Sequence, residues 1–217
     1  DSVCVDAVRD AARKCEALGH IVTETSPDLD VELFMRARDK LWAATICSAV
    51  LGLQRAYGRS AKPEDFEPWT WKQYEAGLQV RGDEVLVARE AMFTLHKQLA
   101  SFMQNYDVIL SPALQTLGPT PGTISTRQTS DEAIRQVSRY VAFSFIFNFT
   151  GQPSMAVPLY WAPDSGMPVG VQFSGHFGDE DLLFRLAGQL ERAYPWFNRL
   201  PPQPFRQLQA GSASSPS

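Results

Sequence analysis

The sequence predicts an α/β fold in which a mixed sheet is covered by helices. Three observations favour this class: helical periodicity in six segments, short apolar or alternating segments between them, and an ordinary globular composition. The 217 residues are 44% hydrophobic and 20% charged, which leaves enough apolar material for a core. Residues 1–209 are expected to form a single α/β domain, and the small polar tail at 210–217 is expected to be disordered.

Six segments have the apolar spacing of helices. They are residues 5–18, 31–57, 69–79, 85–102, 129–147 and 179–193. Gly19 follows the first segment as an expected C-cap, and Thr129 with Glu132 forms a capping-box pattern. The second half of 31–57 is apolar nearly all round, which predicts deep burial.

Four short segments are predicted to be strands. His20 to Thr25 alternates and is rich in β-branched residues, and Asp107 to Leu110 is an apolar run typical of buried parallel strands. Met155 to Tyr160 and Val169 to Phe173 flank a turn-rich segment, which is compatible with a hairpin. So small a sheet is unusual under six helices, and further strands in a missing N-terminal segment would explain it.

Charge, hydropathy and cysteine usage exclude several classes of protein. The net charge of −4 without a dense Lys/Arg run argues against a nucleic-acid or anionic-membrane partner. The longest apolar stretch, Leu41 to Leu53, is too short to span a bilayer. Cys4, Cys15 and Cys47 lack the spacing of a disulfide framework or a zinc site, so reduced thiols in a cytoplasmic protein are expected. No metal or organic cofactor is expected.

Motifs for catalysis are scarce in this chain. It has no G-x-S-x-G elbow, no S-x-x-K motif and no glycine-rich phosphate loop. His20 and His96 are expected to be structural or solvated. Ser174 and His176 are a weak candidate for a self-sufficient hydrolase, because such a pair also needs a third group and an oxyanion hole.

Large aromatic residues in or beside the predicted helices are candidates for the core or for a pocket. They are Trp42, Trp69, Trp71, Tyr74 and Phe145, and most are expected in the core. Trp69 and Trp71 border a polar loop, so they also fit the wall of an apolar small-molecule pocket. Asn148 ends an apolar helix, where it either caps that helix or reaches into a cleft.

The stretch from Asn148 to Glu191 resembles a known family signature. It reads NFTGQPSMAVPLYWAPDSGMPVGVQFSGHFGDEDLLFRLAGQLE. An Asn, a T-G-x-P turn, a strand ending in V-P, a P-V-G-V-Q strand and an acidic start to a leucine-rich helix resemble the C-terminal signature of the amidase signature family. Residues 4–25 and 106–122 also look like that family, and the wording is nearest to bacterial amidases of the 6-aminohexanoate cyclic dimer hydrolase type.

The resemblance implies the C-terminal part of an amidase-signature α/β/α fold. Family members hydrolyse amides with a Ser nucleophile, a bridging Ser and a Lys base, all in an N-terminal half that this chain does not contain. No catalytic residue can therefore be assigned, and the isolated chain is expected to be inactive. By matching position, the substrate-binding candidates are Pro112 and Ala113 at the start of a loop, and Phe145 and Asn148 near a helix end.

The resemblance also implies partners and leaves an alternative open. In the intact enzyme the partners are a small-molecule amide and the missing N-terminal half of the same protein, and a homo-oligomer is possible. Unpaired sheet edges favour self-association of the fragment. The alternative is a non-catalytic binding or assembly module that keeps the amidase-like fold. The sequence upstream of Asp1 would decide between them.

Overall fold

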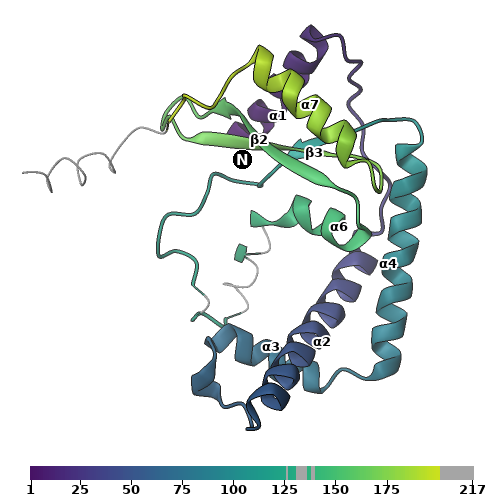
Figure 1. Cartoon of the computed structure of the whole chain (residues 1–217), viewed down its shortest axis with the longest axis vertical. Helices are drawn as coiled ribbons and strands as arrows, with labels where there is room; N and C mark the ends of the chain where they lie inside the picture. Colours follow the sequence, from purple (N-terminus) through teal and green to yellow (C-terminus); the bar gives the residue numbers. More distant parts are fainter. Residues whose placement is uncertain (126, 131–135, 138–139, 201–217) are drawn as a thin grey trace, which may run out of the picture.

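The computed structural model describes residues 1–125, 127–130, 136–137 and 140–200 (Figure 1). The elements in chain order are α1 (Ser2–Ala17), α2 (Val31–Tyr57), a 3-10 turn (Pro63–Asp65), α3 (Pro68–Leu78), α4 (Gly82–Met103), β1 (Ile109–Pro112), α6 (Ala142–Thr150), β2 (Ser154–Trp161), β3 (Pro168–Ser174) and α7 (Glu180–Ala193). The predicted α/β class is confirmed. No helix in this described part of the chain has the length and apolar character needed to cross a bilayer.

The three described strands form an antiparallel sheet in the order β1-β3-β2. The predicted hairpin is confirmed, with Ser154 opposite Ser174 and Trp161 opposite Pro168. The register shifts between Val157 and Tyr160, around Pro158, which has no N–H to offer the ladder.

The expectation of a parallel-type strand at Asp107 to Leu110 was wrong in direction. β1 begins two residues later, at Ile109, and runs antiparallel to β3, with Ile109 opposite Ser174. A four-residue apolar run carries no information about the direction of its partner, which is set by where the distant hairpin lies.

α1 and α7 cover one face of the sheet, the upper side in Figure 1. β3 turns Val169, Val171 and Phe173 towards them, as the two-residue period of a strand requires. The buried partners are Cys4, Ala7, Ala11 and Cys15 of α1, Val157 and Leu159 of β2, and Leu183, Leu186 and Leu190 of α7. Among the residues that the structure describes, this face is the largest continuous core.

α6 lies between the opposite face of the sheet and α2, and α4 runs alongside it (Figure 1). Leu99 and Met103 of α4 pack with Phe147 of α6, and Ile109 of β1 reaches the same cluster. Gln172 of β3 alternates with the core-facing residues and is 5% exposed on this second face. α6 therefore connects the sheet to the helical layer.

The predicted strand at His20 to Thr25 was wrong. These residues have no regular structure, and Ile21 is 97% exposed. A strand exists only when a neighbour accepts its backbone hydrogen bonds, and no described strand lies beside this segment. Alternation and β-branching indicate only a preference for extended backbone.

The deep burial predicted for the second half of α2 was also wrong. Ala43, Cys47 and Val50 form a buried stripe, whereas Trp42 is 36% and Leu53 is 44% exposed. α3 and α4 are the described helices that pack most closely on α2, and they cover one side of it. The other side of an apolar helix is thus left uncovered.

Further expectations concern helix ends, the end of the chain and the cysteines. The helix predicted to finish at Phe147 continues to Thr150, and Gly151 follows in a left-handed conformation with φ of 85°. The Glu132 half of the capping box and the tail at 210–217 lie outside the described residues. Cys4, Cys15 and Cys47 are free and buried, as predicted.

Candidate functional site

Five aromatic rings from three helices form a continuous row, here called the aromatic row. Its members are Trp69 of α3, Trp42 and Phe34 of α2, and Phe145 and Phe149 of α6. Trp42 lies 6.1 Å from Trp69 and 6.0 Å from Phe145, measured between ring centroids, and Phe149 lies 6.3 Å from Phe145 and 6.0 Å from Phe34. Such edge-to-face and offset contacts favour a rigid apolar wall.

One cation lies against the aromatic row. The guanidinium of Arg38 is 5.6 Å from the centroid of Phe145, and its side chain is only 13% exposed. Its Nε and Nη2 donate to Oδ1 of Asp39 at 2.9 and 2.6 Å. The pair keeps the charge balanced while the ring contact desolvates the cation.

Two of the predicted site residues are brought together. Trp69 and Phe145 both contact Trp42, which bridges them. Sequence analysis placed Trp42 with the core aromatics, and its 36% exposure shows that this ring stands at the surface instead. Its position on a helix next to Arg38 carried no signal of this role, because a single sequence does not show which helices pack together.

The other predicted site residues lie outside the aromatic row. Asn148 is exposed on α6, and its side chain has no hydrogen bond to any described residue. Pro112 ends β1, and Ala113 continues the ladder by donating its backbone N–H to the carbonyl oxygen of Gly170 at 3.2 Å. Their roles in substrate binding stay predictions.

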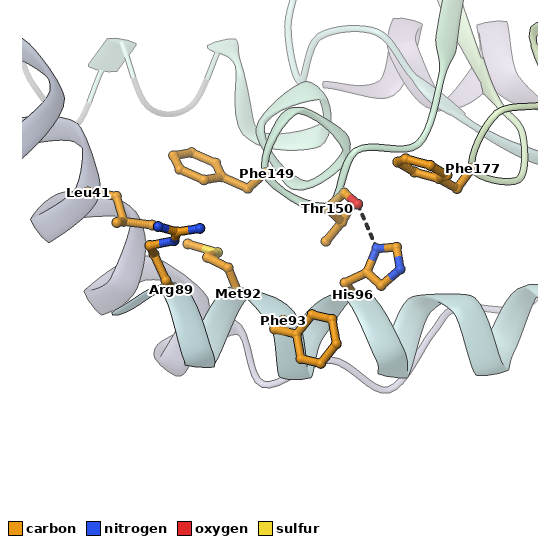
Figure 2. Close-up of a pocket in the computed structure, with 8 residues that line it drawn as sticks. All are labelled: Leu41, Arg89, Met92, Phe93, His96, Phe149, Thr150 and Phe177. Atoms are coloured by element: carbon orange, nitrogen blue, oxygen red, sulfur yellow. Dashed lines mark hydrogen bonds between the residues drawn. The ribbon is translucent and has the colours of Figure 1, made fainter. Parts of the chain in front are cut away.

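A cleft of about 380 Å³ opens beside Phe149 of the aromatic row (Figure 2). Its walls come from four parts of the chain, and they are Leu41, Arg89, Met92, Phe93, His96, Phe149, Thr150 and Phe177. His96 donates from Nδ1 to the carbonyl oxygen of Thr150 at 2.7 Å, since a carbonyl can only accept. The histidine that sequence analysis expected to be structural thus ties α4 to the end of α6.

Ser174 and His176 do not form a catalytic pair. Ser174 is fully buried, and its Oγ lies 2.7 Å from Oγ of Ser154. His176 donates from Nε2 to the carbonyl oxygen of Tyr106 at 2.9 Å, so its ring is occupied elsewhere. The hydroxyl therefore lacks the adjacent base that would activate it.

The Ser154–Ser174 hydrogen bond joins β2 to β3, so Ser174→Ala is expected to affect stability. We expect this substitution to lower the free energy of unfolding by about 1–2 kcal/mol. It removes the hydrogen bond to Ser154 and also the acceptor to which the buried Nε2 of Gln172 donates at 3.4 Å. Urea denaturation followed by circular dichroism measures the change. Ser48→Ala on the exposed side of α2 is the control and should change little. Equal stability of both variants would contradict this role.

Cys4 and Cys15 are poor nucleophiles in this structure. Burial raises the pKa of the Cys4 and Cys15 thiols above their ordinary value, because an apolar environment disfavours the thiolate. The described residues also contain no group of three His, Cys, Asp or Glu side chains arranged to hold a metal ion.

Comparison with known proteins identifies the fold. A family model described as Amidase matches residues 1–184. The 6-aminohexanoate-cyclic-dimer hydrolases of Paenarthrobacter ureafaciens and Pseudomonas sp. (strain NK87) are 29% and 30% identical to this chain over 220 and 225 residues. These alignments cover 97% of this chain but 44% of each relative, so the chain spans less than half the length of the relatives it matches.

A solved structure agrees with the sequence relatives. The structure of 6-aminohexanoate cyclic dimer hydrolase complexed with substrate is similar with a TM-score of 0.83 and 26% identity. The similarity covers 93% of this chain and 43% of that chain. Since the family match extends over most of its residues and the architecture agrees, this chain belongs to the amidase family.

Proposed function

We propose that this chain is the C-terminal portion of an amidase that hydrolyses a carboxylic amide bond. The observation that carries the proposal is the family match over residues 1–184, combined with alignments that cover 44% of each hydrolase. In this proposal the chain completes the sheet and supplies part of the substrate pocket. The serine nucleophile, bridging serine and lysine base belong to polypeptide outside these 217 residues, and the chain alone is inactive.

The aromatic row is proposed as the substrate wall. Trp42, Trp69 and Phe145 present apolar rings on which the acyl part of an amide can pack while water is excluded. Water exclusion matters for this chemistry, because a lysine base must be desolvated to be neutral near pH 7. Asn148 supplies a free amide side chain to the same helix, and Pro112 with Ala113 shape the loop on the other side of α6.

Two features of the described surface favour binding of a partner polypeptide. β1 and β2 are the outer strands of the described sheet, and α2 leaves Trp42 and Leu53 exposed. Unpaired strand edges and exposed large apolar side chains favour association. We propose that the remaining half of the same protein covers them, and that the isolated fragment self-associates. The three free thiols support a cytoplasmic location.

A serine-directed probe tests the position of the nucleophile. Two polypeptides are treated with a fluorophosphonate. One is the 217-residue chain, and the other also contains the residues encoded immediately upstream of it in its gene. We expect no label on the short chain and one labelled serine in the added part of the longer one, located by peptide mass spectrometry. Label on Ser174 would overturn the proposal, and absence of label from both would favour the assembly module.

A further inference from the structure

We infer that the cleft between α4 and the end of α6 is a binding site for a small carboxylate with an apolar body, and that Arg89 holds the carboxylate. This site is separate from the proposed catalytic function, because none of the groups expected to break the amide lies in it. It meets the aromatic row only at Phe149. The inference therefore holds or fails independently of amide hydrolysis.

The charge of the cleft favours an anion. Among its lining residues Arg89 is the one permanent cation, and none is Asp or Glu. Arg36, Arg38 and Arg81 on the neighbouring helical segments each pair with a carboxylate, whereas Arg89 has no ion-pair or hydrogen-bond partner among the described residues. Figure 2 shows its guanidinium turned along the cleft beside Met92. A guanidinium in this setting can receive a carboxylate in a bidentate manner.

The remaining walls suit an apolar ligand body. Met92 lies on the floor of the cleft, and the ring of Phe149 lies above it (Figure 2). A methionine side chain adapts its shape to alkyl or aryl groups, and aromatic rings provide broad contact areas. The volume of about 380 Å³ falls in the range of small-molecule sites, about 300–1,000 Å³.

The far end of the cleft is fixed before any ligand arrives. His96 is held by the carbonyl oxygen of Thr150, nearly parallel to Phe93 at 6.3 Å and edge-on to Phe177 at 6.2 Å. It stands seven residues after Arg89 on α4, which is about 10.5 Å along the helix axis. An extended ligand would therefore place its charged end at Arg89 and its other end beside the aromatic rings around His96. A short fatty acid such as hexanoate has this shape.

Hexanoate is the probe that tests the inference. The full 217-residue chain, with 13C-labelled methionine methyl groups, is titrated with sodium hexanoate and followed by NMR. We expect saturable shifts of the Met92 methyl signal with a dissociation constant in the millimolar range. Arg89→Gln is expected to weaken hexanoate binding about tenfold or more. 1-Hexanol, which lacks the carboxylate, is expected to bind the unaltered chain as weakly as hexanoate binds the Arg89→Gln variant.

Matched controls separate binding from unfolding. Arg9→Gln changes an exposed arginine on α1, away from the cleft, and should bind hexanoate like the unaltered chain. Since Arg89 is exposed, Arg89→Gln should keep the far-ultraviolet circular dichroism spectrum and the urea midpoint of the unaltered chain. A Met92 signal that does not shift on addition of hexanoate would overturn the inference. Equal hexanoate affinity of the Arg89→Gln and Arg9→Gln variants would also overturn it.

Discussion

Replacing Gly77 by alanine is expected to lower the free energy of unfolding by about 3 kcal/mol and to push α3 away from α2. An added Cβ would lie 2.5 Å from Cβ of Cys47 and still closer to the carbonyl oxygen of Ala43. Both obstacles belong to the body of α2, so neither can rotate aside. Because α3 carries Trp69 and α2 carries Trp42, the substitution should also disturb the aromatic row.

Urea denaturation measures the stability loss, and near-ultraviolet circular dichroism reports the tryptophan environment. Gly82→Ala is the matched control, since Gly82 begins α4 and a Cβ there meets nothing within 4 Å. We expect this variant to be as stable as the unaltered chain or slightly more stable, because alanine favours helix. If Gly77→Ala and Gly82→Ala unfold at the same urea concentration, the close packing of α2 on α3 is wrong.

The second large effect is expected at Trp42, in the longer polypeptide that contains the proposed catalytic half. Trp42→Ala removes the ring that joins Trp69 to Phe145. The substrate then loses an apolar contact, and water occupies the space that the ring filled. We expect kcat/KM for amide hydrolysis to fall about 10- to 100-fold. Steady-state kinetics over a range of amide concentrations measures this change and separates its KM and kcat parts.

Phe197→Ala is the control for Trp42→Ala. Phe197 is 80% exposed and lies after α7, outside the aromatic row. It should leave kcat/KM within twofold of the unaltered enzyme, on the order of the small effects of surface changes. Unchanged kinetics in Trp42→Ala, with the protein still folded by circular dichroism, would show that the aromatic row is not a substrate wall.

The sequence allowed most helices to be predicted, since an amphipathic stripe is a local property. α2 and α4 appear close to their predicted bounds, and Gly58 ends α2 in a left-handed conformation with φ of 62°. The β2–β3 hairpin was also predictable, because its turn and its two strands are adjacent in the chain. His20 to Thr25 failed because a strand depends on a distant neighbour, which propensity does not supply.

The candidate site was predictable in part. Trp69 and Phe145 were chosen for different reasons, one from its loop context and one from a family resemblance, and the structure joins them through Trp42. Their contact depends on how α2, α3 and α6 cross, which is a property of packing. Arg89 and His96 were missed as a pair for the same reason, because the wall that completes their cleft comes from α6 and the β3–α7 loop.

Hydrolysis of 6-aminohexanoate cyclic dimer by the short and the longer polypeptide, at equal molar concentration, tests the central claim most directly. Liberated amino groups are quantified over time. The account predicts no turnover above the buffer blank for the 217-residue chain, and turnover of this or another small carboxylic amide by the longer polypeptide. Full turnover by the short chain alone would contradict it, because the bond-breaking groups would then lie within these residues.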